Sequence, residues 1–367
     1  MKRILAQARK ELTQVRRDRL VLFLALVLPQ ILLALFGTAL SLTVTDVPIV
    51  IQDLDQTAFS RAYADAWRQT LTFRVVNLEP DAQPIDALDR GTARAAIVIP
   101  ENFERDALRG QPADVQILVD ATDANTANVM RGNAFGVSAN FARSQRLSAS
   151  PAIRPEARLW YNPGRDSKRF VGPGAFAVMF ALFPPLLAAL ALSREGEQKT
   201  ILQVYASSIT AREYLLGKTL AYWLVAVAQW LIGLAVLRLI FGIWFVGDPT
   251  PLLVGTVSYL FCCVSFGVLV GSAIPNQAAA IQVVQIVGFL LSFLLSGLIF
   301  PVSNIPAAIR WIAYVVPARY YIELARDAFV RGAGWPGVWH IPIVLAVIGL
   351  ILFMLAWKRM RRMQVSA

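Results

Sequence analysis

The stretch that decides the fold is an apolar run followed at once by a charged one. Residues 171–193 read VGPGAFAVMFALFPPLLAALALS, and residues 194–218 read REGEQKTILQVYASSITAREYLLGK. The first stretch can cross a bilayer as a helix, because the hydrocarbon core is about 30 Å thick and each helical residue rises 1.5 Å. The second carries seven charged side chains and precedes another apolar run, so it must lie outside the bilayer. This alternation predicts a helical membrane protein.

Composition extends this interpretation to the whole chain. Of its 367 residues, 56% are hydrophobic and 16% are charged, against about 25% charged residues in an ordinary soluble domain. We therefore predict a polytopic α-helical fold with six transmembrane helices. The predicted spans are residues 20–43, 171–193, 219–243, 251–274, 278–300 and 338–357.

Basic residues beside the spans predict their orientation. Residues 1–19 contain seven Lys and Arg against two acids, and residues 358–367 contain four Lys and Arg. Because cytoplasmic segments are enriched in Lys and Arg, we expect both termini and the loop 194–218 in the cytoplasm. Residues 1–19 also have apolar side chains at helical spacing, which predicts an amphipathic helix on the inner membrane surface. A cleaved signal peptide is the alternative, but the first apolar run exceeds the roughly 7–15 residues of a signal core.

Residues 44–170 are then expected outside the cytoplasm, as an inserted α/β domain. Their 15 Lys and Arg nearly balance 16 Asp and Glu, and long domains cross a membrane regardless of charge. Runs of β-branched residues predict strands, and the stretches between them read as helices. The predicted strands lie in VPIVIQD, LTFRVVN, ARAAIVIP and ADVQILVD, and a longer helix is expected over about 125–147.

Motifs for chemistry are incomplete in this sequence. Gly217-Lys218-Thr219 would end a phosphate-binding loop only if a glycine stood five residues before Gly217, and that residue is Arg212. The chain has one histidine and two adjacent cysteines, so we predict no catalytic site and no metal site. Its net charge of +11 is concentrated beside the spans, which argues against nucleic acid as a partner.

The charged loop has helix-capping patterns of its own. Ser193 can cap a helix start with Glu195 and Glu197 in the first turn. Thr210 with Glu213 fits a capping box. Apolar residues between these two patterns predict a surface that a partner covers, and a solvated linker is the alternative.

This loop resembles a motif of ABC-2 type exporter permeases, in the subgroup with a large extracytoplasmic domain after the first span. Members often read R-E-x-E-x-G-T in the first half of the loop and end it in G-K. This chain reads REGEQKT over residues 194–200 and ends in Gly217-Lys218, with the spacing intact. Lys199 stands where glycine is usual, and Ser208 stands where proline is usual.

A second motif is similar to the family's extracytoplasmic helical hairpin after the fifth span. It reads SGLIFPVSNIPAAIRWIAYVVPARYYIELARDAFVRGAGW over residues 296–335, and three prolines interrupt it. We expect the hairpin 301–337 to lie at the outer membrane interface rather than to span. Aromatic residues prefer headgroup depth, and the candidates here are Trp311, Tyr314, Tyr320 and Tyr321.

The resemblance implies a permease subunit driven by a separate ATPase, which binds ATP and Mg while this chain binds no cofactor. The loop 194–218 would dock on that subunit and export a hydrophobic or amphipathic, drug or lipid-like, molecule across a bacterial inner membrane. Other implied partners are a second permease copy or a paralogue, membrane lipids and a periplasmic adaptor. The alternative for Glu195 and Glu197 is that they only cap a helix. The coupling residues carried over from the family are Glu195, Glu197, Thr200, Tyr205, Gly217 and Lys218.

Small and polar residues in the fifth span give a second candidate site. Gln285, Gly288, Ser292 and Ser296 recur at spacings of three and four residues, which places them on one face of a regular helix. Such a face indicates close helix packing, including a dimer seam, or the lining of a translocation path.

Two other classes of function compete with transport. A membrane receptor or sensor would bind a ligand with residues 44–170, but the cytoplasmic segments are too short for a signalling domain. A membrane-embedded hydrolase would need a paired acid, base or nucleophile within the spans, and the predicted spans offer none.

Overall fold

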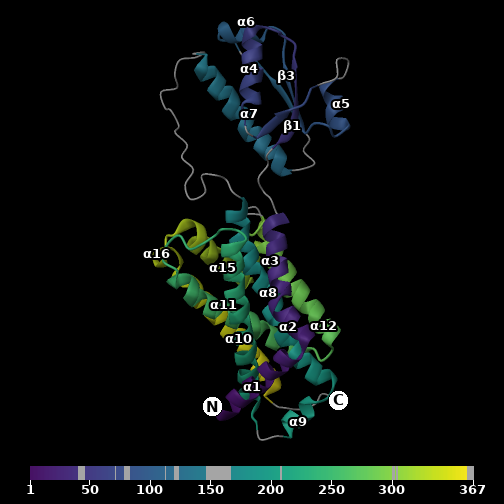
Figure 1. Cartoon of the computed structure of the whole chain (residues 1–367), viewed down its shortest axis with the longest axis vertical. Helices are drawn as coiled ribbons and strands as arrows, with labels where there is room; N and C mark the ends of the chain where they lie inside the picture. The colour runs from purple at the N-terminus through teal and green to yellow at the C-terminus, as the bar shows by residue number, and fades with distance from the viewer. Residues whose placement is uncertain are drawn as a thin grey trace. The chain divides into compact units, whose positions relative to one another are not determined.

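The computed structural model divides into two compact units, shown in Figure 1. The membrane unit comprises Met1–Ser41 and Leu159–Ala367, and the α/β unit comprises Leu42–Arg158. The structure describes residues 1–39, 46–70, 72–77, 83–111, 113–119, 124–145, 167–206, 209–299, 302 and 305–361.

Within these described residues, six helical segments are long and apolar enough to cross a membrane. Each overlaps one predicted span, although residues 40–43 of the first predicted span fall outside the described residues. The six segments are Arg19–Thr38, Val171–Glu197, Ala211–Leu239, Thr250–Ala273, Gln277–Leu295 and Trp335–Met360.

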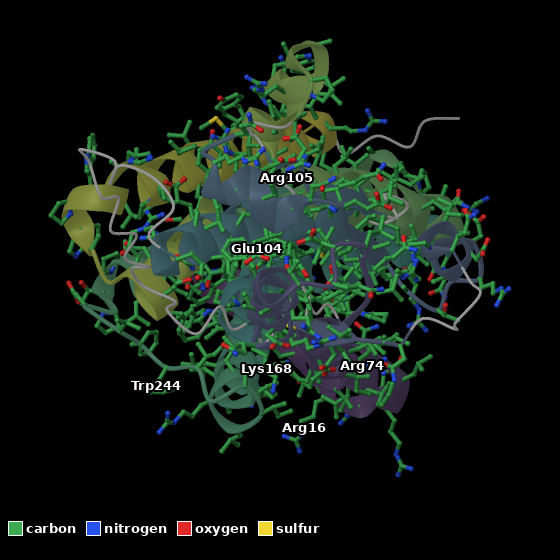
Figure 2. All side chains as sticks on the ribbon, turned by 90° about the horizontal axis from the view of Figure 1, so that it is seen from above. Arg16, Arg74, Glu104, Arg105, Lys168 and Trp244 are labelled. Atoms are coloured by element: carbon green, nitrogen blue, oxygen red, sulfur yellow. The ribbon has the colours of Figure 1, made fainter. Side chains whose placement is uncertain are left out.

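Helices from distant parts of the chain lie together at each of two opposite ends of the membrane unit. The N-terminus, α1 and α9 lie at one end, while α15 and α16 lie near the other (Figure 1). Arg16 and Trp244, both labelled in Figure 2, are exposed side chains of this unit. Its helices are α1 (Lys2–Arg17), α2 (Arg19–Leu26), α3 (Leu28–Ala39), α8 (Ser167–Glu197), α9 (Ile201–Tyr205), α10 (Ala211–Leu239), α11 (Thr250–Ala273), α12 (Gln277–Val283), η1 (Val284–Leu290), α13 (Leu291–Leu295), α14 (Ala307–Val315), α15 (Pro317–Arg326), η3 (Asp327–Arg331), α16 (Trp335–Val338) and α17 (His340–Met360).

Glycines allow α8 and α11 to pack with their backbones in contact. A Cβ on Gly267 would lie 2.2 Å from the carbonyl oxygen of Pro185, and one on Gly271 would lie 2.6 Å from that of Ala189. Small residues permit such close approach between transmembrane helices, where lipid provides no hydrophobic drive for association. Any larger side chain at Gly267 would therefore push the two helices apart.

The segment that follows the fifth span forms α14, α15, η3 and α16, as a series of short helices. Trp311 and Tyr314 are 65% and 50% exposed, as an interfacial position requires. Tyr321 is fully buried instead: its hydroxyl accepts a hydrogen bond from Trp230 Nε1 at 2.8 Å, and its ring stacks on Tyr259. Tyr321 therefore faces the protein interior rather than lipid headgroups, because it lies on the inner face of the amphipathic helix α15.

The α/β unit is built on a four-stranded sheet of order β2-β1-β3-β4. β1 pairs in parallel with β2 and β3, whereas β4 pairs antiparallel with β3. Each strand lies within one of the predicted stretches, and buried aliphatic residues of β1 and β3 pack against aromatic residues of α4. The elements are β1 (Val47–Asp53), α4 (Ala58–Arg68), β2 (Phe73–Val75), α5 (Pro84–Asp89), β3 (Ala95–Ile99), α6 (Phe103–Leu108), β4 (Gln116–Val119) and α7 (Ala124–Ser144).

Two aspartates, one at the end of β1 and one two residues later, fix the helices that follow. Asp53 Oδ2 accepts a hydrogen bond from Ser60 Oγ at 2.7 Å, which ties β1 to α4. Asp55 Oδ2 accepts one from the backbone N–H of Glu104 at 3.1 Å, which ties the same turn to α6; Glu104 is labelled in Figure 2. Both carboxylates serve the fold of this unit.

Candidate functional site

The predicted cytoplasmic loop 194–218 begins inside a helix rather than at a new helix start. α8 continues without a break to Glu197, so Ser193 lies inside the helix, where its Oγ donates a hydrogen bond to the Ile274 carbonyl at 2.8 Å. Glu195 and Glu197 therefore occupy the last turn of α8. The prediction that they lie in the first turn of a helix is wrong, and the helix dipole disfavours acids where they stand.

Partners from other helices offset this unfavourable position. Glu195 binds two lysines, and its Oε2 also accepts a hydrogen bond from the Tyr214 hydroxyl. Glu197 Oε2 accepts hydrogen bonds from both the backbone and the side-chain nitrogen of Gln277, at 3.2 and 2.8 Å. Gln277 is the first residue of α12, so Glu197 caps the start of a different helix from its own.

A buried ion pair joins the N-terminal helix to the third span. Lys218 is fully buried, and its Nζ lies 2.9 Å from Glu11 Oε1 and 3.2 Å from Glu195 Oε1. Glu11 itself is 1% exposed, and its second oxygen accepts a hydrogen bond from the Tyr222 hydroxyl at 3.2 Å. Lys10 completes the group, with its Nζ 3.0 Å from Glu195 Oε1. We call Lys10, Glu11, Glu195 and Lys218 the ion cluster.

The ion cluster has two acids and two bases, so it is neutral as a whole. Partial burial disfavours the charged form of Lys10, but the hydrogen bond and the charge of Glu195 outweigh it and raise the pKa of Lys10. A buried charge is tolerated when an opposite charge and hydrogen bonds accompany it. The cluster thus links α1, α8 and α10 through groups that cannot be separated without leaving a charge unpaired.

Close packing holds α1 against the start of α10. A Cβ on Gly217 would lie 2.6 Å from Gln7 Cβ and 3.0 Å from the Ile4 carbonyl oxygen. Gly217 therefore serves the docking of α1, one residue before Lys218. Because both residues face α1, neither presents a surface to another chain.

The remaining loop residues lie around this centre. Thr200 Oγ1 donates a hydrogen bond to the Glu195 carbonyl at 3.3 Å, and the predicted Thr210–Glu213 capping box at the start of α10 is confirmed. Tyr205 ends α9, but its side chain lies outside the described part of the structure, as does Ser208. Leu202 of α9 is 44% exposed. Among the described side chains of this short helix, Ile201 and Val204 are only partly exposed.

Lys199, which stands where the family pattern has glycine, adopts a backbone conformation that favours glycine. Its φ of 55° falls in the left-handed region, which costs a residue with a Cβ about 1 kcal/mol or more and which glycine adopts freely. The turn that ends α8 therefore explains why the family pattern has glycine at this position.

Glu11 is the central residue that the sequence pattern did not single out. It interrupts the apolar face of the predicted N-terminal helix, between Ala8 and Val15, which are both buried. An acid on the apolar face of a basic helix was the available signal. Its partner stands 207 residues further along the chain, which no local pattern reveals.

Comparison with known proteins agrees with this architecture. Residues 19–358 match the profile of the ABC-2 family transporter proteins. The chain belongs to the ABC-2 transporter family. It is therefore a multi-pass membrane permease subunit of an ABC transporter, whose ATPase is a separate subunit.

Bacterial permeases resemble this chain over nearly its whole length. It is 28% identical to the probable multidrug ABC transporter permease YbhS of Escherichia coli (strain K12), over 97% of this chain and 93% of YbhS. It is 27% identical to the probable multidrug ABC transporter permease YbhR of the same strain, over 93% of this chain and 94% of YbhR. The linearmycin resistance permease protein LnrN of Bacillus subtilis (strain 168) is 20% identical, over 98% of this chain and all of LnrN.

The fifth span of the permease differs from a regular helix. Its middle, η1, is a π-helix, and this wider turn shifts the buried face by one residue. Gly288, Ser292 and Ser296 are buried, but Gln285 is exposed and Val284 takes its place. Gln285 thus lies off the buried face that Gly288, Ser292 and Ser296 share, and the role of these four residues in a dimer seam or translocation path stays a prediction. Gly288 and Ser292 line a small apolar cavity of about 220 Å³ within the permease.

A second polar contact crosses the permease between the first and third spans. Pro29 has no N–H, so the Ala25 carbonyl loses its usual partner within the helix. Gln229 of α10 donates its side-chain N–H to that carbonyl, and Gln30 donates to the Gln229 carbonyl at 3.2 Å. We call Gln30 and Gln229 the glutamine clamp. It explains how the first span is broken between α2 and α3 without an unpaired carbonyl at Ala25.

Acidic, histidine and cysteine side chains do not gather elsewhere. Within the described residues, no three of them lie close enough to hold a metal ion. The two cysteines, Cys262 and Cys263, are buried in α11 as free thiols.

Proposed function

We propose that this permease exports a hydrophobic or amphipathic molecule across the inner membrane of a bacterial cell. The support is its similarity to YbhS and YbhR, whose names describe multidrug permeases, and to LnrN, whose name describes linearmycin resistance. The apolar character of the spans suits a cargo of this kind. ATP and Mg would be bound by the partner ATPase rather than by this chain.

The observation that carries the coupling mechanism is the ion cluster. We propose that the ATPase docks on the loop 194–218, with Glu197, Thr200 and Tyr205 nearest to the partner. Closure of the ATPase would move the end of α8, and Glu195 would pass this movement to Lys218 of α10 and to Lys10 of α1. Gly217 and Lys218 would then transmit force inside the permease, since both are buried against α1.

The proposed orientation puts both termini and the loop 194–218 in the cytoplasm. The α/β unit would then be extracytoplasmic, and the hairpin 301–337 would lie at the outer interface. Support comes from the basic residues of α1, which lies at the same end of the membrane unit as α9 (Figure 1). A second permease copy or a paralogue would complete the translocation path. A periplasmic adaptor would bind the α/β unit, and membrane lipids would surround the spans.

Co-purification with the ATPase tests this function. The permease is extracted from its native membrane in mild detergent, and ATP hydrolysis by the ATPase subunit that co-purifies is measured with and without the permease. We expect a stable complex whose hydrolysis depends on the permease. The proposal fails if no ATPase subunit is recovered and if an added ATPase hydrolyses ATP at the same rate without the permease.

Single substitutions test the loop as the coupling element. We expect Glu197→Ala and Tyr205→Ala to leave insertion into the membrane intact while ATP hydrolysis no longer drives export. Glu101→Ala, at an exposed position in the α/β unit, is the matched control. Unchanged export per ATP hydrolysed in both loop variants would refute the assignment.

A further inference from the structure

A cavity of about 770 Å³ lies beside the ion cluster, between α1, α2, α8 and the loop that follows α8. Cavities that hold small ligands usually measure roughly 300–1,000 Å³, so this one can hold a head group with part of a chain. None of the proposed coupling residues needs such a volume for its own contacts. Its lining therefore requires an explanation beyond the ion cluster.

The lining is divided between apolar and polar side chains. Aliphatic residues of the spans form one part, which suits a hydrocarbon chain. Carboxamides belong to the other part, together with charged side chains, and they can both donate and accept hydrogen bonds. The aliphatic part includes Leu24, Leu187 and Leu190, and the polar part includes Gln14, Gln198 and Gln277.

The charges at the cavity cancel one another. Five charged side chains line it, and each has an oppositely charged neighbour. A head group with net charge would have to compete with the existing partner of one of these charges. An uncharged or zwitterionic head can exchange hydrogen bonds with the carboxamides at no such cost. The pairs are Lys10–Glu195 at 3.0 Å, Lys218–Glu11 at 2.9 Å and Arg194–Asp18 at 3.8 Å, with Lys218 behind the wall.

One wall of the cavity is formed by an exposed part of the first span. Leu20 of α2 lines the cavity and is 67% exposed, and α2 begins the first span. α2 has only eight residues, with a helix start at Arg19 and the Pro29 break after it. A molecule in the surrounding leaflet can therefore reach the cavity past α2.

We propose that this cavity receives an amphiphile with an uncharged or zwitterionic head from the membrane leaflet that α1 borders. This inference rests on the proposed export function, because it assigns the class of cargo and its point of loading. The head lies among the carboxamides beside the ion cluster, and the chain lies against Leu24, Leu187 and Leu190. Loading at this place brings cargo into contact with α8, the helix that ends in the coupling loop.

Photo-crosslinking of the full-length permease in nanodiscs tests the site. The probes are phosphatidylcholine and phosphatidylglycerol, each carrying a diazirine on one acyl chain, and labelled peptides are identified by mass spectrometry. We expect the zwitterionic probe to label the peptides of Leu24 and Leu187 about tenfold more than the anionic probe does, relative to the exposed peptide of Leu350, because a net charge must compete with the existing partners of the charged side chains. n-Dodecyl-β-maltoside below its micellar concentration should compete with this labelling.

A filled cavity supplies the matched variant. Leu190→Trp should reduce labelling at Leu24 about tenfold, whereas Leu350→Trp, on the exposed face of α17, should not. Equal labelling of cavity and lipid-facing peptides, preference for the anionic probe, or no effect of Leu190→Trp would each overturn the proposal. The competition by maltoside needs no variant, so it decides the matter if Leu190→Trp does not fold.

Repeating the crosslinking with the ATPase present separates this inference from the proposed function. Labelling is measured on the permease alone and then with the ATPase added. Loss of labelling whenever the ATPase is present, with or without ATP, would overturn the loading site and show a docking surface for that subunit. A failed co-purification would reject the export function while leaving the crosslinking result unchanged, so the two failures are distinct.

Discussion

At the residue scale, the ion cluster makes Glu11 and Lys218 dependent on each other. Removing one partner of a buried pair leaves the other charge uncompensated, at a cost of about 3–5 kcal/mol. We therefore expect Glu11→Gln to destabilise the purified permease by about 3 kcal/mol or less, because Glu195 remains beside Lys218 and still compensates part of its charge. Thermal and detergent denaturation of the permease in the same membrane mimetic measure the change.

The control and the double variant separate charge from packing. Glu101→Gln changes the same groups at an exposed position, so it should alter stability by less than about 0.5 kcal/mol. Glu11→Gln combined with Lys218→Met removes both charges, and the loss should be smaller than for Glu11→Gln alone. If the single and double variants lose equal stability, the pairing of Glu11 with Lys218 contributes nothing of its own.

Lys199 offers a prediction of the opposite sign. Its left-handed backbone conformation at the end of α8 is strained for a residue with a Cβ. Lys199→Gly should therefore stabilise the permease by about 0.5–1 kcal/mol, and Lys199→Ala should not. The melting temperatures of the two variants measured side by side decide this, and a destabilised Lys199→Gly would show that the side chain contributes more than the strain costs.

The residues of the candidate site could be predicted from the sequence only where they stand close together along the chain. Glu195, Glu197 and Thr200 stand together in the sequence and could be singled out there. Glu11 could not, because its partner Lys218 comes from a helix far along the chain. Tyr321 was misplaced for a similar reason: an aromatic residue near a membrane interface gives the same pattern whether it faces headgroups or, as here, Trp230.

At the element scale, the glutamine clamp compensates for a helix break. Gln229→Leu would leave the Ala25 carbonyl without its donor, and hydrogen bonds between transmembrane helices are worth about 0.6–2 kcal/mol. We expect a loss of that size in the unfolding free energy of the permease. Pro29→Ala restores an N–H to the first span, so Gln229→Leu should cost less in that background.

The double-mutant cycle tests this explanation directly. The coupling between Gln229→Leu and Pro29→Ala is the difference between the cost of Gln229→Leu in the two backgrounds. Gln285→Leu is a matched control, since this carboxamide is exposed on the fifth span. Additive effects of Pro29→Ala and Gln229→Leu would mean that the glutamine clamp does not compensate for the hydrogen bond that Pro29 removes.

The fifth span shows why an element can be predicted and its face missed. Length and apolar composition were enough to place the span, and they are properties of the segment as a whole. The π-helical middle adds a residue to the turn, so Gln285 moves off the buried face while Gly288 stays on it. A periodicity of 3.6 residues assumes a regular helix and has no signal for this change.

At the scale of the whole molecule, the number of apolar helices followed from composition and length. Six such helices lie in the described part of the chain, each overlapping a predicted span. The packing among them did not follow, because lipid-facing and protein-facing side chains are both apolar in a membrane protein. Glycine contacts such as that of Gly267 with Pro185 became visible only in the structure.

Orientation of the permease is a property of the whole molecule and can be tested with single cysteines. The proposed orientation has residues 1–19 in the cytoplasm, as the positive-inside rule predicts, and it would put the α/β unit on the opposite side of the membrane. Glu101→Cys, in the α/β unit, should react with a membrane-impermeant maleimide in spheroplasts, whereas Gln198→Cys, in the loop 194–218, should react only after the membrane is permeabilised. Both positions are exposed in the permease, and expression without the ATPase keeps that subunit from covering Gln198. The native Cys262 and Cys263 are buried in α11 and should react little with the maleimide. Labelling of the unsubstituted permease gives this background.

The reverse pattern, with Gln198→Cys labelled from outside, would mean that the permease has the opposite orientation. It would also exclude a cytoplasmic ATPase from the loop 194–218, so this one measurement bears on the orientation and the coupling mechanism together.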